Sequence, residues 1–189
     1  MTATVRQATR DDATVIRKIA SESWHAAYAP ILGKETVEEK IDDWYAIDGL
    51  EQSIEETVTE EDAFFVVAEL ENRSEREDRS EREDRSKRTA NDDPIVGFAH
   101  VVSHAEIRSA ASLARIYVCP DHWGDGIGRA MLDDVERHVS GRYDRLRLAV
   151  LADNEVGVRF YESTGFDRVE TRSCPLGDGL EEYIYEKSV

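Results

Sequence analysis

The chain has few cysteines and no long apolar run, and both deficits restrict what it can be. No uncharged stretch approaches the ~20 residues that a membrane-spanning helix needs. Residues 1–12 include several charged side chains and no apolar signal region, so a cytoplasmic location is expected. The two cysteines, Cys119 and Cys174, lie far apart and form no metal-ligand cluster with histidine. We therefore expect two reduced thiols and no bound metal.

Positive charge is the second deficit. The 189-residue chain has 41 Asp and Glu residues against 24 Lys and Arg, of which five are lysine, and its formal net charge is −17. Nucleic acid is excluded as a partner, because phosphate binding needs a basic footprint. Many carboxylates and scarce lysine are typical of proteins from halophilic archaea, in which acidic groups keep the surface hydrated and salt screens their repulsion. An ordinary acidic protein is the alternative interpretation.

Residues 71–93 have almost no apolar side chain. They contain the hexapeptide Ser-Glu-Arg-Glu-Asp-Arg twice in tandem, starting at Ser74 and at Ser80. The segment cannot bury enough apolar surface to offset the entropy of ordering, so we predict a mobile charged loop inserted into a single domain of residues 1–189. A docking arm for a partner is an alternative, and so is a short charged helix, because Glu and Arg favour helices.

The apolar pattern elsewhere alternates between strands and helices. A first helix begins at Asp11 or Asp12, and a second helical region covers 35–57 with a break near Asp48-Gly49. The order of elements predicts an α/β domain with a mixed sheet, in which 63–70 and 94–103 are neighbouring antiparallel strands. Strands are predicted at 5–9, 63–70, 95–102, 113–118, 145–152, 166–171 and 182–185, and two further helices at 126–139 and 155–164.

The clearest chemical signal is a glycine-rich turn between a strand and a helix. Three glycines, at positions 124, 126 and 128, lie between Pro120 and this helix. Glycine lets backbone N–H groups approach a ligand, and the helix start adds unpaired donors and a partial positive charge, so an anion site suited to a pyrophosphate is predicted. A dinucleotide fold would need an acidic residue ~20 positions on, and a nucleotide-triphosphate loop would need Lys then Ser or Thr where Arg129 and Ala130 stand.

Together with residues 148–166, this turn resembles the GNAT superfamily of acetyltransferases. The family pattern is a strand ending V-x-P, a Q/R-x-x-G-x-G/A loop, and then Asn, Phe-Tyr and Gly-Phe. The matching residues are Val118, Pro120, Gly126, Gly128, Asn154, Phe160, Tyr161, Gly165 and Phe166. The resemblance implies the GNAT fold, with a mostly antiparallel sheet of about seven strands flanked by about four helices. It also implies an enzyme that transfers the acetyl group of acetyl-CoA directly to a primary amine.

The resemblance assigns roles to single residues. Tyr161 would donate a proton to the departing CoA thiolate, which suits a group with a reference pKa of ~10. Asn154 would bind the pantetheine arm together with the backbone near Ile116 and Val118, where the strand is expected to splay at a bulge. The N–H groups of Gly126 to Ala130 would hold the pyrophosphate. The full set expected to bind acetyl-CoA is Ile116, Tyr117, Val118, Trp123, Gly124, Asp125, Gly126, Ile127, Gly128, Arg129, Ala130, Asn154 and Phe160.

The chain departs from the family pattern at three positions. Trp123 stands where Arg or Gln is frequent, and Asp125 places a carboxylate in the phosphate loop, which weakens cofactor binding at low salt. Ser112 occupies the position where family members often carry a Glu as the general base. Candidate substitutes for this base are Glu22, His25, His100, His104 and Glu106.

Residues 23–28, Ser-Trp-His-Ala-Ala-Tyr, resemble a stretch found near the acceptor cleft of other GNAT proteins. Trp24, His25 and Tyr28 are therefore expected to bind a small-molecule or peptide amine, although Trp24 falls on the apolar stripe of its helix and could belong to the core. A homodimer is expected, because dimers are frequent in the family. The alternative functions are a non-catalytic acyl-CoA sensor and an interaction module that acts through residues 71–93.

Overall fold

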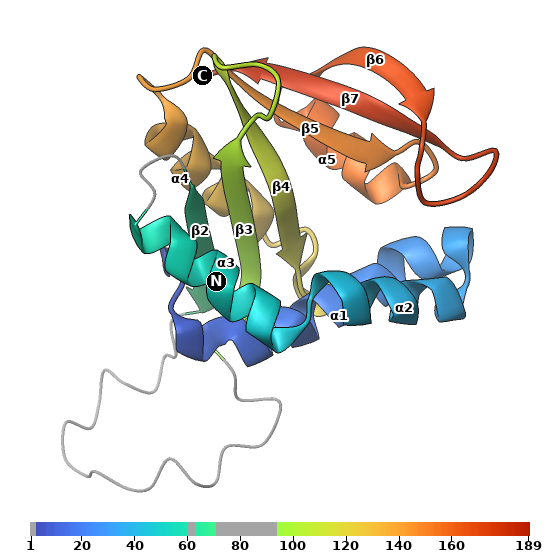
Figure 1. The fold of residues 1–189 in the computed structure, drawn as a ribbon, viewed down its shortest axis with the longest axis horizontal. Helices are drawn as coiled ribbons and strands as arrows, with labels where there is room; N and C mark the ends of the chain where they lie inside the picture. The colour runs from blue at the N-terminus through green and yellow to red at the C-terminus, as the bar shows by residue number, and fades with distance from the viewer. Residues whose placement is uncertain (1–2, 60–62, 71–93) are drawn as a thin grey trace, which may run out of the picture.

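A seven-stranded sheet forms the centre of the molecule. The computed structural model describes residues 3–59, 63–70 and 94–189, so the predicted loop at 71–93 lies outside the described residues. The strand order is β1-β2-β3-β4-β5-β7-β6 (Figure 1). The strands are β1 (Ala3–Gln7), β2 (Phe64–Leu70), β3 (Ile95–Ser103), β4 (Ala110–Val118), β5 (Arg145–Leu151), β6 (Asp167–Ser173) and β7 (Glu181–Ser188).

The sheet is mixed and mostly antiparallel, as predicted. Its one parallel pair is β4 with β5, and this pairing covers only residues 110–112 against 145–147. Beyond these residues the two strands diverge (Figure 1), and β5 continues to pair with β7 alone. From Leu113 onward, the edge of β4 that faces β5 therefore has no strand partner among the described residues, although the other edge still pairs with β3. This opens the sheet in its middle.

Five helices flank the sheet, one more than expected. They are α1 (Ala13–Leu32), α2 (Lys34–Trp44), α3 (Ile47–Thr59), α4 (Ile127–Val139) and α5 (Glu155–Ser163). The predicted break at Asp48-Gly49 was wrong, because α2 ends at Trp44 and Gly49 lies inside α3. The reason is packing: Tyr45 leaves the helix and its ring is buried in the core. A glycine inside an exposed helix is merely unfavourable, by about 1 kcal/mol, and does not force a break.

Helices cover both faces of β2 and β3. Alternate residues such as Val66 and Ala68 pack with α4 on one face, whereas Phe65 and Val67 pack with α1 and α3 on the other. This two-sided burial explains the uninterrupted apolar run of β2. Figure 1 shows α3 in front of these strands and α4 behind them.

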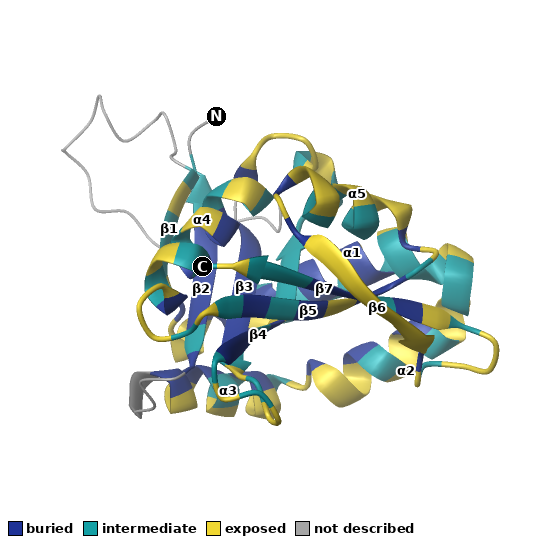
Figure 2. Cartoon of the chain, turned by 90° about the horizontal axis from the view of Figure 1, so that it is seen from above, coloured by how far each residue is buried: buried dark blue, intermediate teal, exposed yellow. Residues whose placement is uncertain are grey.

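The C-terminal part of the sheet is more open. All residues of the edge strand β6 are exposed, and Figure 2 shows this strand in the colour of exposed residues. The seven predicted strands are all present, each bounded within three residues of its prediction. The strands β2 and β3 on either side of the segment 71–93 pair antiparallel as expected.

Candidate active site

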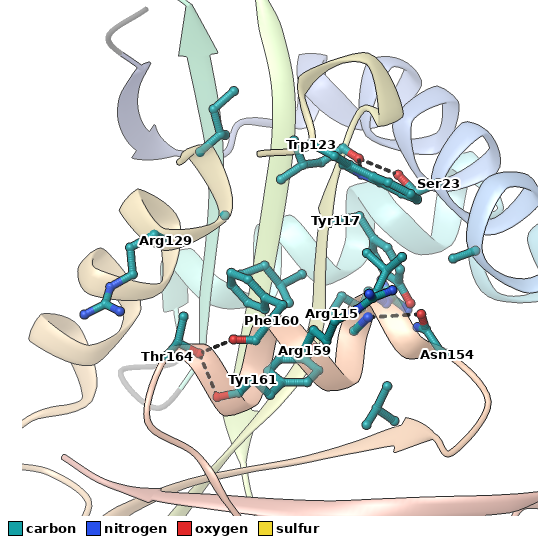
Figure 3. Close-up of a pocket in the computed structure, with 18 of the residues that line it drawn as sticks. Ser23, Arg115, Tyr117, Trp123, Arg129, Asn154, Arg159, Phe160, Tyr161 and Thr164 are labelled. Carbon is teal, nitrogen blue, oxygen red and sulfur yellow. Dashed lines mark hydrogen bonds between the residues drawn. The ribbon is translucent and has the colours of Figure 1, made fainter. Parts of the chain in front are cut away.

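A cavity of about 690 Å³ lies where β4 and β5 diverge (Figure 3). Its walls come from five parts of the chain. These are β4 from Leu113 to Val118, β5 at Ala149 and Val150, the turn and first residues of α4, the helix α5 with its flanking residues, and the residues Ser23, Ala27 and Tyr28 of α1. The expected splay of β4 is confirmed, but the bulge lies at Ala114, where His100 pairs with Arg115 and Val101 with Leu113.

The turn before α4 presents free backbone donors to this cavity. Gly126 is the N-cap of α4 with φ of 84°, a left-handed conformation that favours glycine. In the described part of the chain, the N–H groups of Gly126–Arg129 have no hydrogen-bond partner, and all four residues line the cavity. The N–H of Ala130 already donates to the Gly126 carbonyl at 3.0 Å. The backbone donors available at the expected pyrophosphate site are therefore the N–H groups of Gly126–Arg129. The N–H group of Ala130 is not among them.

A second glycine is required by close packing. A Cβ at Gly128 would lie 3.1 Å from the ring of Phe160, so the close approach of α4 and α5 at this residue requires glycine. Asp125 does not line the cavity, and its carboxylate lies 3.2 Å from Nδ1 of His122. The expected conflict between this carboxylate and a bound pyrophosphate is reduced, because Asp125 has a partner of its own in the turn.

Trp123 and Ser23 fix the end of β4. The indole N–H of Trp123 donates to the Val118 carbonyl at 2.8 Å, and the Ser23 hydroxyl donates to the same oxygen at 3.0 Å (Figure 3). One carbonyl thus joins the turn, the strand and α1. Trp123 stays partly exposed at the mouth of the cavity, where its ring covers the strand end.

Tyr161 and Asn154 are both brought to the cavity by α5. Burial raises the pKa of Tyr161 well above its ordinary value, and the nearby Tyr28 adds to the increase. In the described part of the chain its hydroxyl has no hydrogen-bond partner. Asn154 is buried, and its side-chain oxygen accepts the Gly157 N–H at 3.1 Å as the N-cap of α5. Because its pKa is raised, Tyr161 can donate a proton but cannot act as a base near neutral pH.

The α1 side of the cavity is lined by tyrosine. Burial raises the pKa of Tyr28 to about 12, and side-chain hydrogen bonds with Asn154 and Tyr117 partly oppose this increase. Tyr117 is more strongly affected, since burial raises its pKa well above the ordinary value. From Tyr117 the aromatic packing continues to Tyr45, whose ring centroid lies 6.3 Å from that of Tyr117 and whose hydroxyl accepts the indole N–H of Trp24 at 3.2 Å.

Of the three residues expected to bind the acceptor, only Tyr28 lines the cavity. Trp24 is buried in the core, as the alternative interpretation predicted. His25 lies outside the cavity, and its Nδ1 is 2.8 Å from the Ser21 carbonyl. The remaining members of the predicted acetyl-CoA set, apart from Asp125 and Ala130, all line the cavity.

None of the five candidate bases, all of which lie in the described residues, lines the cavity. His100 is buried beneath it, and burial together with the charge of Arg115 lowers its pKa to about 4. Glu22 lies 3.6 Å from the thiol of Cys119. His104 accepts the N–H groups of Glu106 and Ile107 in the turn between β3 and β4.

The residues of the cavity wall that sequence reasoning missed include Ser23, Arg115 and Arg159. Strand alternation could have identified Arg115, because residues two apart share a face of a strand and Tyr117 had already been selected. Among the residues that the structure describes, no group of three or more His, Cys, Asp or Glu side chains could hold a metal ion. No helix in the described ranges is long and apolar enough to cross a membrane.

Comparison with known proteins identifies the family. The model of the acetyltransferase (GNAT) family matches residues 35–166. The chain is 26% identical over 188 residues to a spermidine N(1)-acetyltransferase of Thermoplasma acidophilum, covering 99% of this chain and 98% of that protein. The crystal structure of the PaiA N-acetyltransferase of the same organism, in complex with coenzyme A, superposes with a TM-score of 0.76 at 25% identity over all of both chains.

More distant structures share the fold. A putative GNAT-family acetyltransferase from Desulfovibrio desulfuricans has a TM-score of 0.64 at 18% identity, with 99% of both chains covered. The family match covers most of the chain and includes the turn before α4 and the helix α5 that form the cavity. The chain belongs to the GNAT family, and it is an acetyl-CoA-dependent enzyme that transfers an acetyl group to an amine.

Proposed function

We propose that the cavity between β4 and β5 is the place where this reaction occurs. The observation that supports this most directly is the divergence of the two strands, with four N–H groups that have no partner among the described residues at one end and the half-buried Tyr161 on the adjoining helix. The residues present also fit acetyl-CoA by charge, because three arginines and, among the residues that the structure describes, no Asp or Glu line the cavity. Gly126–Arg129 would bind the pyrophosphate, as expected at a helix N-terminus.

The chain's own residues would then bind acetyl-CoA and protonate its leaving sulfur. When bound, acetyl-CoA supplies an activated acyl thioester. Tyr161 donates the proton that the leaving sulfur takes up, and its raised pKa keeps this proton in place at neutral pH. The unpaired edge of β4 offers backbone groups to the pantetheine arm near Ile116. Since no candidate base lines the cavity, the amine is proposed to react in its neutral form, and the proton that its nitrogen then loses restores the hydroxyl of Tyr161.

A small-molecule primary amine is the proposed acceptor. The name of the T. acidophilum relative, spermidine N(1)-acetyltransferase, supports a small molecule over a protein N-terminus. A non-catalytic acyl-CoA sensor remains the alternative. It would use the same free N–H groups for binding and would not depend on the hydroxyl of Tyr161.

Replacing Tyr161 by Phe separates the two. We expect kcat to fall about 10²- to 10⁴-fold, the range for loss of a positioned general acid, while the dissociation constant for acetyl-CoA changes little. Tyr183→Phe is the matched control, because Tyr183 lies outside this cavity and its ring can still contact Arg168. Unchanged turnover in Tyr161→Phe would contradict the assignment of the general acid.

Further proposals rest on the sequence alone. We propose a single domain with residues 71–93 as an inserted loop, a cytoplasmic location, a high-salt environment such as that of a halophilic archaeon, and a homodimer. The net charge of −17 supports the salt adaptation. Sedimentation equilibrium in low and molar KCl would measure both the oligomeric state and its dependence on salt.

A further inference from the structure

Arg115 differs from every other cation of the cavity wall in having no carboxylate partner. The guanidinium carbon lies 4.9 Å from the centroid of the Tyr45 ring, and Nη2 donates to the Trp44 carbonyl at 3.2 Å. In the described part of the chain Nη1 is buried and has no hydrogen-bond partner. A guanidinium offers five N–H donors in a planar fork, so part of its donor capacity is unused inside a cavity.

The other two arginines of the wall are already paired. Arg129 bonds Asp133 at 2.9 Å and Arg159 bonds Glu155 at 3.2 Å, each one turn away on its own helix. Both side chains are more than half exposed, at 53% and 72%. They lie on α4 and α5, beside the proposed phosphate site. Arg115 instead extends from the middle of β4.

Strand alternation places Arg115, which follows the bulge at Ala114, on the same face of β4 as Tyr117. This face is covered by α1, α2 and α3, because Tyr117 packs in the core of that side, whereas Ile116 and Val118 pack on the α4 side. Figure 3 shows Arg115 and Tyr117 together in the wall of the cavity. Its cross-strand neighbour His100 has its pKa lowered to about 4, so it brings no negative charge to Arg115.

We infer that Arg115 binds a carboxylate of the acceptor, so that the substrate is an amine that also carries an acid group, such as an amino acid. This inference rests on the proposed function and specifies its substrate class. A ligand carboxylate in the cavity would form a charge-assisted pair with the guanidinium of Arg115, which lines the wall. A polyamine would bring a second ammonium group toward Arg115 in a cavity where, among the described residues, no Asp or Glu lines the wall.

The test compares ligands that differ only in the acid group. The probes are the common α-amino acids, β-alanine and γ-aminobutyrate, each against its carboxamide, with putrescine and spermidine as polyamines. Acetylation is measured by release of CoA, and binding to the CoA-loaded protein is measured by calorimetry. We expect at least one acid to exceed its carboxamide by about tenfold or more in kcat/KM and in affinity, as for a hydrogen-bonded ion pair.

The variant Arg115→Gln should remove this preference by raising KM for the acid while leaving the carboxamide nearly unchanged. Arg137→Gln is the matched control, since Arg137 is an exposed arginine that pairs with Asp134 and does not line the cavity. An equal loss for acid and carboxamide would show that Arg115 only ties β4 to the end of α2, and would overturn the inference. If Arg115→Gln does not fold, the wild-type ratio of acid to carboxamide decides alone.

Three other results are informative. Acetylation of spermidine or putrescine that equals or exceeds that of every acid would overturn the inference and leave the proposed function intact. Selective binding of an acid without turnover would support the inference and contradict the proposed function. Use of succinyl-CoA in place of acetyl-CoA, lost in Arg115→Gln, would place the carboxylate on the acyl group and overturn its assignment to the acceptor.

Discussion

The wall of the cavity and the molecule as a whole carry opposite charges. The chain has a net charge of −17, yet three arginines and, in the described residues, no Asp or Glu line the cavity. The carboxylates nearest to the site are turned to other partners, as Asp133 is to Arg129 and Glu155 is to Arg159. Overall charge therefore says little about a ligand site, because a site is determined by the few groups that face it.

The cavity wall contains two different kinds of group that can bind an anion. The turn before α4 uses backbone N–H groups and the helix start, which carry no net charge and do not depend on the surrounding carboxylates. Arg115 instead uses a full positive charge, which a carboxylate of the same chain would neutralise. The following experiments alter residues of the cavity wall or a direct neighbour of one, and they are ordered by the size of the expected effect.

The largest effect concerns the protonation of His100 beneath the cavity. Its pKa is about 4 when folded, against an ordinary value of 6.5, so the unfolded chain binds this proton first as the pH falls. His100 thus makes the protein less stable below about pH 6.5 and down to about pH 4. Between about pH 7 and about pH 5 the loss should be about 2 kcal/mol, measured by urea unfolding.

His100→Leu provides the control for this prediction. The side chain is buried and stacks on Phe65, so an apolar residue of similar volume can occupy the site. The variant should lose less stability on acidification than the wild type by about the same 2 kcal/mol. Equal pH dependence of the two proteins would mean that His100 does not titrate below its ordinary pKa.

The next effect concerns the backbone donors before α4. Gly126→Ala introduces a side chain at φ of 84°, which should destabilise the protein by about 1–2 kcal/mol and weaken acetyl-CoA binding about tenfold. Gly141→Ala is the matched control, because Gly141 has φ of 81°, its added Cβ also meets open space, and it lies beyond the other end of α4. Equal cofactor affinity in the two variants would show that the turn does not bind the pyrophosphate.

The smallest effect concerns the carbonyl shared by Trp123 and Ser23. Trp123→Phe removes one donor but leaves Ser23 bonded to Val118, so we expect a loss of about 1 kcal/mol or less in unfolding free energy. Ser23→Ala should cause a similar loss in unfolding free energy. The double variant leaves the carbonyl unpaired and should lose more than the sum of the two, whereas additive losses would contradict a shared acceptor.

Much of the fold could be predicted because it depends on local patterns. The alternation of apolar residues located all seven strands, and the two-sided burial of β2 follows from its apolar run. The break between α2 and α3 was misplaced, because it is set by burial of Tyr45 against residues far away in the chain. Gly49 indicated a position where the helix is locally weak, but tertiary packing put the break elsewhere.

The candidate site was predictable where its residues belong to one contiguous motif. Gly124 and Gly126–Arg129 of the turn line the cavity as expected, as do Asn154 and Tyr161, whereas Asp125 does not. Arg115 was missed because its importance comes from its surroundings: among the described residues, the five parts of the chain that form the cavity wall contribute no Asp or Glu to it. Trp24 and His25, which were expected to bind the acceptor, do not line the cavity, because Trp24 is buried in the core and His25 lies outside the cavity.

The central claim, that the carboxylate-free cavity binds acetyl-CoA within an acidic molecule, is tested most directly by calorimetric titration with acetyl-CoA in low and in molar KCl. We predict one-site binding that is tighter in KCl. Salt screens the repulsion between the anionic cofactor and the net charge of −17 beyond ~10 Å, while contacts inside the cavity are screened less. No binding in either buffer, by protein that circular dichroism shows to be folded, would contradict it.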